Sequence, residues 1–174
     1  MDSKIGRILL PEETILRRVR ELGRQISDDY RGRDLIVACV LKGAVVFLAD
    51  LIRNLDMHVG LDFVQVSSYG SRIETSGEVK LIRPITTDIE DRDVLIVDDI
   101  IDSGLTLYRL KENLLSRNPA SLRICVLLDK PERRTENIKV DYMGFEIPNE
   151  FIIGYGMDYN GQYRGLRYIA TLKL

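Results

Sequence analysis

The sequence predicts a single α/β domain spanning residues 1–174, with a mainly parallel sheet flanked by helices. Short apolar runs rich in branched residues, typical of buried strands, alternate along the chain with segments of helical periodicity. The chain has 174 residues, which falls in the range of roughly 100–200 residues for one domain. Hydrophobic residues make up 45% and charged residues 30% of the chain, the balance of a globular protein.

The first expected element is a helix over residues 11–30, because Ile15, Val19, Leu22 and Ile26 recur at helical spacing. A buried strand follows, since residues 35–41 form a continuous apolar run. The remaining elements are expected as helices over 44–55 and 105–117, and as strands over 63–66, 79–82, 94–97, 122–128, 142–147 and 151–155. Residues 69–77 are polar with glycine near both ends and predict a flexible loop. The segment after Asp141 is expected to form a small hood over one sheet edge.

Composition excludes several classes of protein. With 27 acidic and 25 basic residues the net charge is −2, which does not favour non-specific binding to nucleic acid. No apolar run approaches the roughly 18 residues of a membrane span, and no signal-peptide core follows the N-terminus, so a cytoplasmic location is expected. Cys39 and Cys125 lie in apolar runs and are expected to be buried and free, and His58 is the sole histidine, which excludes sites built on several His ligands.

The segment over residues 94–106 concentrates the chemistry. Four branched apolar residues lead into Asp98 and Asp99, and Asp102 follows, then Ser103, Gly104, Leu105 and Thr106 at the expected start of a helix. Ligands in open α/β sheets bind beyond the carboxyl ends of the strands, and a helix N-terminus with small residues suits a phosphate monoester. Asp98 and Asp99 can accept hydrogen bonds from sugar hydroxyls, directly or through a hydrated magnesium ion. Either carboxylate alone could simply end a strand, but the three carboxylates with Ser-Gly-x-Thr are far more specific.

Residues 94–106 resemble the phosphoribosyl diphosphate signature of type I phosphoribosyltransferases. The similarity to the hypoxanthine-guanine branch of that family extends over residues 35–168. It is carried by Leu41-Lys42-Gly43, Ser68-Tyr69-Gly70, Leu128-Asp129-Lys130-Pro131, residues 145–148, residues 151–155, Asp158-Tyr159-Asn160 and Arg164. The acidic residue at Asp102 favours a 6-oxopurine enzyme over adenine and orotate enzymes.

The resemblance implies transfer of the 5-phosphoribosyl group from phosphoribosyl diphosphate to N9 of hypoxanthine or guanine, with Mg2+ as cofactor. Family relatives are usually homodimers or homotetramers, and neither a nucleic-acid nor a membrane partner is expected. Asp102 would be the catalytic proton acceptor beside N7. The other implied roles are the 5'-phosphate for Asp102, Ser103, Gly104, Leu105 and Thr106; ribose for Asp98 and Asp99; diphosphate for Lys42, Gly43 and Arg164; a mobile lid beginning at Ser68 and Tyr69; the base for Lys130, Phe151, Ile152 and Asp158; and metal for Asp98, Asp99 and Asp158.

Three alternatives remain open on sequence alone. A regulator of the same fold could bind RNA and sense nucleotides, which Asp102 and the segment after Lys130 argue against. A transferase for another base such as xanthine would differ in a few contacts near residues 151–158. A phosphatase or receiver-type domain could use Asp98 or Asp99 as phosphoacceptor, although the Ser-Gly-Leu-Thr loop fits this less well.

Overall fold

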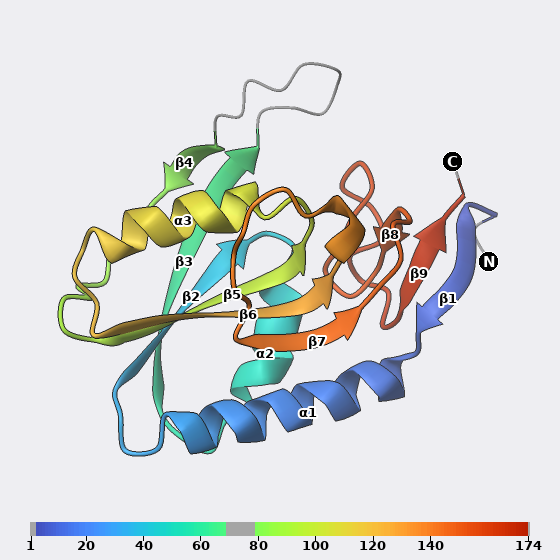
Figure 1. The fold of residues 1–174 in the computed structure, drawn as a ribbon. Coiled ribbons are helices and arrows are strands. Elements are labelled where there is room, and N and C mark those ends of the chain that lie inside the picture. The colour runs from blue at the N-terminus through green and yellow to red at the C-terminus, as the bar shows by residue number, and fades with distance from the viewer. Residues whose placement is uncertain (1–2, 69–78, 174) are drawn as a thin grey trace.

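The computed structural model describes residues 3–68 and 79–173, and its centre is a six-stranded sheet with helices on both faces (Figure 1). A smaller three-stranded sheet lies beside it. The helices are α1 (Glu12–Asp29), α2 (Val45–Ile52), α3 (Leu105–Leu115) and the short 3-10 helix η1 (Pro131–Arg133). The strands are β1 (Ile5–Leu10), β2 (Leu35–Leu41), β3 (Val59–Ser68), β4 (Val79–Arg83), β5 (Asp93–Ile101), β6 (Ser121–Asp129), β7 (Tyr142–Glu146), β8 (Ile152–Ile153) and β9 (Ile169–Leu172).

The order of strands in the large sheet is β4-β3-β2-β5-β6-β7. All neighbouring pairs are parallel except β3 with β4, which is antiparallel. The chain runs outward from β2 to β3 and β4, returns to β5 beside β2, and then runs outward in the opposite direction to β6 and β7. This reversal between β2 and β5 creates a topological switch point, where α/β sheets bind ligands at the carboxyl ends of the strands.

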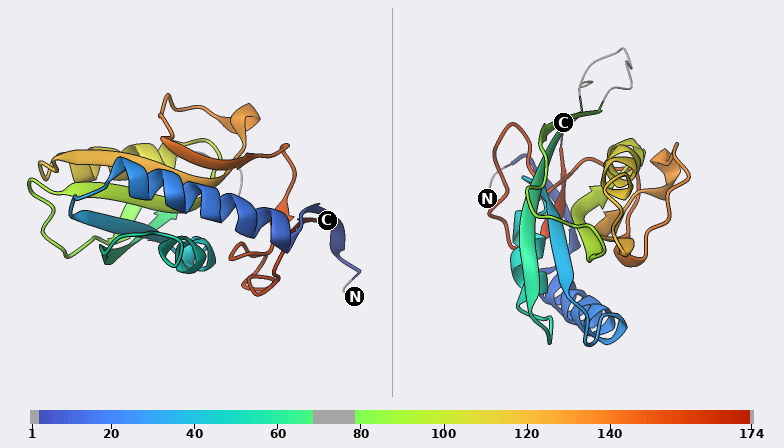
Figure 2. Two further views of the ribbon diagram at one scale, coloured as in Figure 1. Left: turned by 90° about the horizontal axis from the view of Figure 1, so that it is seen from below. Right: turned by 90° about the vertical axis from the view of Figure 1, so that its left-hand side faces the viewer.

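Helices cover both faces of the large sheet, with α3 on the side opposite to α1 and α2 (Figure 2). Alternate residues of β2 therefore enter different cores. Leu35, Val37 and Cys39 pack in the cluster that contains α1 and α2, whereas the residues between them pack in the cluster that contains α3. Burial on both faces explains why the run over residues 35–41 is apolar throughout instead of alternating. The predicted parallel sheet flanked by helices is thus confirmed.

The predicted helices and strands match the structure, with shifted ends. The helix expected over 44–55 is shorter, as α2, and the strand expected over 63–66 is longer, as β3. The prediction that a strand ends before Asp98 is wrong, because β5 continues through both aspartates to Ile101 and pairs there with β6. The loop expected over 69–77 lies outside the described residues.

The small sheet has the order β1-β9-β8, and both of its pairs are antiparallel. Its strands come from the two ends of the chain, which lie side by side in Figure 1. Neither β1 nor β9 is predicted from the sequence. The expected hood made of the C-terminal segment is not confirmed in that form, because β7 joins the large sheet and β1 supplies an edge of the small one.

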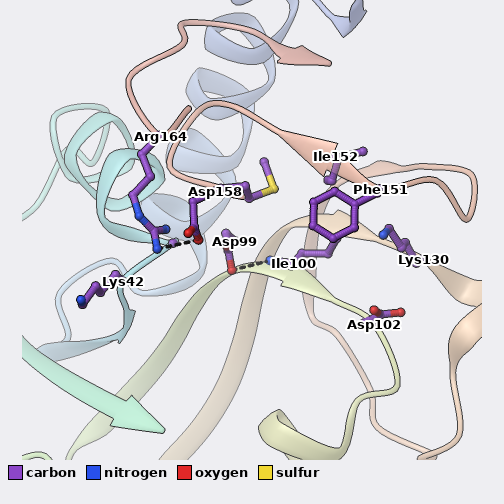
Figure 3. Close-up of a pocket in the computed structure, with 11 residues that line it drawn as sticks. Lys42, Asp99, Ile100, Asp102, Lys130, Phe151, Ile152, Asp158 and Arg164 are labelled. Atoms are coloured by element: carbon purple, nitrogen blue, oxygen red, sulfur yellow. Dashed lines mark hydrogen bonds and ion pairs between the residues drawn. The ribbon is translucent and has the colours of Figure 1, made fainter. Parts of the chain in front are cut away.

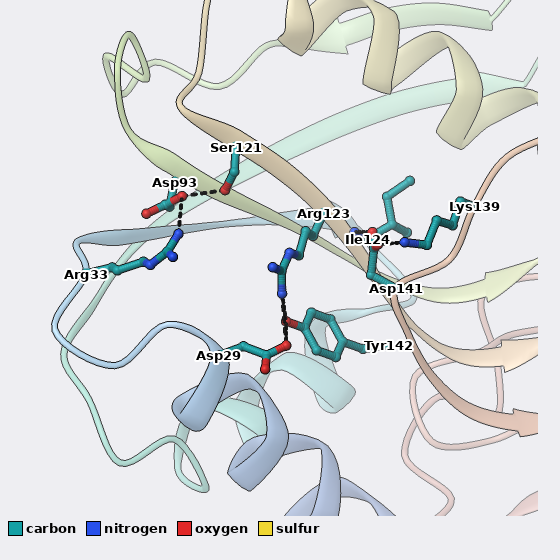
Figure 4. A network of polar contacts seen from close by, with 9 residues as sticks. All are labelled: Asp29, Arg33, Asp93, Ser121, Arg123, Ile124, Lys139, Asp141 and Tyr142. Carbon is teal, nitrogen blue, oxygen red and sulfur yellow. Dashed lines mark hydrogen bonds and ion pairs between the residues drawn. The ribbon is translucent and has the colours of Figure 1, made fainter.

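A polar network connects the C-terminal end of α1 with β6 and β7, away from the switch point (Figure 4). The Tyr142 hydroxyl donates to Asp29 Oδ2 over 2.7 Å, and Arg123 Nη1 donates to the same carboxylate oxygen over 2.9 Å. The Arg123 guanidinium also lies 5.2 Å from the ring centroid of Tyr30, within the range of a cation–π contact.

Both cysteines are free and buried, as expected. Among the residues described, no helix combines the length and apolar character that crossing a membrane requires.

Asp62 anchors the segment that leads into β5. Its carboxylate is buried and accepts hydrogen bonds from the backbone N–H groups of Thr86, Thr87 and Phe63, each over 2.7 Å. Burial alone would raise the pKa of Asp62, but the hydrogen bonds, led by that from Thr87, outweigh it and lower the pKa to about 2. The ionised carboxylate therefore stabilises the fold.

We expect Asp62→Asn to lower the free energy of unfolding by about 2 kcal/mol at pH 7, because it removes the ionised acceptor. A depressed pKa contributes stability that is complete above the ordinary carboxyl pKa and is lost as the pH falls toward 2. Urea unfolding at pH 7 and at pH 3 should therefore show a difference between variant and wild type that shrinks in acid. The exposed Asp88→Asn is the control, and a constant difference at both pH values would contradict the role of Asp62 ionisation.

Candidate active site

A pocket of about 330 Å³ lies at the carboxyl ends of β2 and β5, at the switch point of the sheet. Figure 3 shows Lys130, Asp102 and Phe151 toward one end of this pocket and Lys42, Arg164 and Asp158 toward the other. All lining residues except Ile100 and Met157 are predicted from the sequence. The pocket is lined by Lys42, Gly43, Asp99, Ile100, Asp102, Lys130, Phe151, Ile152, Met157, Asp158 and Arg164.

Gly43 brings three segments of the chain together. It is the second residue after β2, and the Leu41–Lys42 peptide bond before Lys42 is cis. A Cβ at Gly43 would overlap Asp99 Oδ2, and a Cβ at Gly156 would overlap the Gly43 carbonyl oxygen. The loop after β2, the end of β5 and the C-terminal segment therefore meet at a point where side chains have no room.

The two aspartates at the end of β5 occupy different environments. Asp98 is only 6% exposed and accepts the Asp99 N–H over 2.9 Å, whereas Asp99 lines the pocket. Burial, followed by the neighbouring Asp99 carboxylate, raises the pKa of Asp98 well above its ordinary value. Burial also raises the pKa of Asp99, and Arg164 is among the groups that oppose this. Two carboxylates held this close favour a cation or hydrogen-bond donors beside them.

The turn between β5 and α3 has the form expected for a phosphate loop. Gly104 has a φ of 87° and precedes the first residue of α3. The Ser103 hydroxyl accepts the Leu105 N–H over 3.3 Å, and the Ser103 carbonyl accepts the N–H of Thr135 over 3.0 Å. Ser103, Gly104, Leu105 and Thr106 lie at the helix N-terminus beside Asp102, and are not among the residues that line the pocket. A helix N-terminus carries partial positive charge and free N–H groups, which suit an anion.

Two arginines of the segment that follows β6 contact Asp102. Arg134 Nε donates to the Asp102 carbonyl over 3.2 Å, and its other end forms an ion pair with Asp129. Arg133 Nε lies 3.1 Å from Asp102 Oδ1, an ion pair whose alignment is not that of a hydrogen bond. Asp102 Oδ1 is buried and has no aligned hydrogen-bond donor, whereas the side chain as a whole is 41% exposed and lines the pocket.

Lys130 and Phe151 complete the same end of the pocket. The Lys130 residue is 7% exposed, and burial lowers the pKa of its ammonium group while Asp102 opposes that shift. Phe151 is 45% exposed although it is a large apolar residue. Its ring stands edge-on to Tyr159, with 5.6 Å between centroids and an interplanar angle of 87°. An exposed ring in a pocket, held by a second ring, suits stacking on a flat ligand.

Asp158 and Arg164 form an ion pair at the opposite end, with 2.6 Å between Asp158 Oδ1 and Arg164 Nη2 (Figure 3). Arg164 Nη1 donates to the Gly156 carbonyl over 2.6 Å. Asp158 Oδ2 accepts the Gly161 N–H over 2.7 Å. Together with Lys42, this arrangement presents cations to a doubly charged oxyanion while the Asp158 carboxylate remains close.

The structure does not test the two residues predicted to begin a lid, Ser68 and Tyr69. Ser68 is the last residue of β3 but its side chain lies outside the described part of the chain, and so does the whole of Tyr69. The contacts of Arg133 and Arg134 with Asp102 are not predicted from the sequence. They join positions about 30 residues apart with no periodic pattern, so the one available signal is a pair of arginines shortly after Lys130.

Magnesium fits the donors of this pocket only with help from a substrate. In residues 3–68 and 79–173, no three His, Cys, Asp or Glu side chains converge as a metal cage. Mg2+ is commonly held by one or two carboxylates, water and phosphate oxygens of a substrate, without a complete protein cage. Of the three carboxylates predicted to bind metal, Asp99 and Asp158 line the pocket and Asp98 lies buried beside it.

Comparison with known proteins identifies the class. The phosphoribosyl transferase domain family matches residues 7–160. The chain therefore belongs to the phosphoribosyl transferase family. It is 47% identical over 173 residues to the hypoxanthine-guanine phosphoribosyltransferase of Bacillus subtilis, covering 99% of this chain and 96% of that protein. The protein of the same name from Mycobacterium tuberculosis is 50% identical, with 97% and 86% covered. A hypoxanthine phosphoribosyltransferase structure from Staphylococcus aureus superposes with a TM-score of 0.94 at 45% identity, covering 99% of this chain and 96% of that one.

We expect Gly43→Ala to lower kcat/KM for phosphoribosyl transfer on the order of 10²-fold, because the added methyl group displaces the Asp99 carboxylate. Steady-state kinetics and a thermal melt would be compared with those of Gly165→Ala. That control adds the same methyl group at a glycine with no neighbour within 4 Å. Equal activity in the two variants would show that the contact of Gly43 with Asp99 does not matter.

Proposed function

We propose that this protein transfers the 5-phosphoribosyl group from phosphoribosyl diphosphate to N9 of hypoxanthine or guanine, giving IMP or GMP and diphosphate. The observation that carries the proposal is one pocket with two chemically different ends. Lys130, Asp102 and Phe151 suit a 6-oxopurine, and Lys42 and Arg164 suit a diphosphate. The relatives named above are enzymes of this activity by name, and no observation favours the alternative of an RNA-binding regulator.

At the base end, Lys130 would donate a hydrogen bond to O6 of the purine. A 6-amino group would present a second donor to the same ammonium, so adenine would be rejected. Phe151 would stack on the ring, and the Ile152 carbonyl would accept a hydrogen bond from its edge. Asp158 would also bind the base. Its ion pair with Arg164 places its carboxylate toward the diphosphate end.

Asp102 would act on the imidazole ring of the purine. N9 can attack the ribose only as the ring loses a proton, and a carboxylate beside N7 can accept that proton or stabilise the N7–H tautomer. The partly exposed Asp102 side chain lines the same end of the pocket as Lys130 and Phe151, which supports this role. Arg133 and Arg134 would keep the carboxylate facing the base while the proton moves.

The ribose carbon would pass through an oxocarbenium-like state, so positive charge grows on the sugar and negative charge on the departing diphosphate. Lys42 and Arg164 would stabilise the diphosphate, and the Gly43 backbone could approach it closely. The turn from Asp102 to Thr106 would bind the 5'-phosphate at the N-terminus of α3. Asp98 and Asp99 would face the ribose hydroxyls, with Asp99 the nearer to the pocket.

One magnesium ion would be held by Asp98 and Asp99 and a second by Asp158, directly or through water, in each case with substrate oxygens. Bound there, it would supply Lewis-acid stabilisation of the leaving diphosphate. A lid beginning at Ser68 and Tyr69 would exclude water, which competes with the purine for the oxocarbenium carbon.

The family relationship also supports a cytoplasmic location and a homodimer or homotetramer. Analytical ultracentrifugation would test the oligomeric state.

The first test is an initial-rate assay with phosphoribosyl diphosphate, Mg2+ and one of four bases: hypoxanthine, guanine, xanthine or adenine. We expect turnover of hypoxanthine or guanine and none of adenine. Asp102→Asn should lower kcat by roughly 10²–10⁴-fold, the usual contribution of a positioned acid or base. The surface variant Asp88→Asn is the control, and failure of the wild-type protein to convert any base would refute the proposed function.

Lys130→Gln should weaken discrimination between hypoxanthine and adenine. A glutamine amide can donate to a 6-oxo group or accept from a 6-amino group, so we expect roughly a tenfold rise in KM for hypoxanthine and detectable adenine use. Competition assays with both bases would measure the ratio of kcat/KM values. Lys139→Gln, at an exposed lysine paired with Asp141, is the matched control. An unchanged ratio would remove Lys130 from base selection.

A further inference from the structure

A tyrosine–aspartate pair lies directly behind the diphosphate end of the pocket. Tyr155 is 3% exposed, and its hydroxyl donates to Asp50 Oδ2 over 2.6 Å. Burial, followed by the hydrogen bond to Asp50, raises the pKa of Tyr155 far above its ordinary value, so the hydroxyl stays protonated and remains a donor. Asp50 belongs to α2 and forms an ion pair with Arg53 through its other oxygen.

Tyr155 lies in the turn that carries one end of the site. Its φ of 50° is in the left-handed region, where a non-glycine residue needs support from its surroundings. Its N–H donates to the Leu166 carbonyl over 2.8 Å, and the next N–H, that of Gly156, donates to the Arg164 carbonyl over 3.0 Å. The Gly156 carbonyl in turn accepts from the Arg164 guanidinium. The position of the Arg164 head therefore depends on where this turn sits.

The same turn touches the loop that follows β2. Gly156 packs against the Gly43 carbonyl so closely that no Cβ could fit. Gly43 precedes α2, and Asp50 lies two helical turns further along that helix. The turn is thus held at two points, by the loop before α2 beside the pocket and by α2 itself at the Tyr155 hydroxyl.

Space is available for Arg164 to leave its position. A second cavity of about 200 Å³ lies behind it, and Asp50, Tyr155 and Arg164 all line that cavity. Arg164 also lines the active-site pocket, so its side chain lies between the two spaces. A long flexible cation beside a cavity that holds a carboxylate would gain rotamer freedom if the turn loosened.

We infer that Asp50 and Tyr155 are positioning residues for phosphoribosyl transfer, which hold Arg164 and Asp158 in the active-site pocket by fixing the turn at residues 154–157 to α2. This inference rests on the proposed function and deepens it. Neither side chain lines the active-site pocket, so both act through the residues they hold. The effect should concern the diphosphate end and spare the base end.

Tyr155→Phe is the test, because it removes one oxygen and keeps the ring. The matched control is Tyr142→Phe, which breaks a 2.7 Å tyrosine–aspartate hydrogen bond at the far edge of the sheet. Asp50→Asn is the conservative variant, because its amide oxygen can still accept from Tyr155. For each variant we would measure kcat, both KM values, the melting temperature, and the affinity for phosphoribosyl diphosphate with Mg2+ by calorimetry in the absence of base.

Tyr155→Phe should raise both the KM and the dissociation constant for phosphoribosyl diphosphate by roughly five- to tenfold, the loss expected for one hydrogen bond. The KM for hypoxanthine should stay within twofold of wild type, as should every constant of Tyr142→Phe and Asp50→Asn.

Tyr155→Phe constants equal to those of Tyr142→Phe, or an equal loss for base and phosphoribosyl diphosphate, would overturn the inference. An inactive wild-type protein would instead refute the proposed function. The binding measurement would still test the positioning role.

Discussion

The close packing of backbone around Gly43 is the constraint on which the rest of the pocket depends. The carboxylate of Asp99 and the turn at Gly156 both occupy the volume that a side chain at this position would take. Each of the three segments contributes a different function to the site: a loop with Lys42, a strand with carboxylates, and a turn that leads to Asp158 and Arg164. Their convergence places Lys42, Arg164 and the carboxylates of Asp99 and Asp158 around one pocket.

Charge is distributed in the pocket to match a ligand that changes its charge during reaction. Asp99, on β5, lies in the middle, and each end holds a cation with a carboxylate, Lys130 with Asp102 and Arg164 with Asp158 (Figure 3). A developing positive sugar would therefore lie near carboxylates, and a developing anion near Lys42 and Arg164. The protein tolerates the buried Asp98 beside the partly buried Asp99 because backbone N–H groups and Arg164 offset part of their desolvation.

Much of the fold follows from local sequence patterns. The run over residues 35–41 has the bounds of β2, because burial on both faces makes every residue apolar. The site residues from Asp98 to Thr106 are predictable because they join an apolar strand to the start of a helix. The roles of Lys130, Phe151, Asp158 and Arg164 follow only from the family resemblance. The small sheet is not predictable from local patterns. Ile5 pairs with Leu172, almost a full chain length away in sequence, and the register between β1 and β9 shifts twice. The sequence does not predict the extension of β5 past Val97, because aspartates are uncommon in strands. In the structure Asp98 nevertheless pairs with Val126 of β6.

That extension places the site carboxylates on an inner strand of the large sheet. β5 lies between β2 and β6, so releasing Asp99 or Ile100 requires opening the ladder at the centre of the sheet. Amide hydrogens there should exchange with solvent only through global opening, whereas those of the C-terminal turns can exchange through local opening. Substitutions at the exposed Phe151 could therefore change the fit of a base with little loss of stability. Residues 152–157 are buried, and the carboxylates on β5 could hardly change without rebuilding the core.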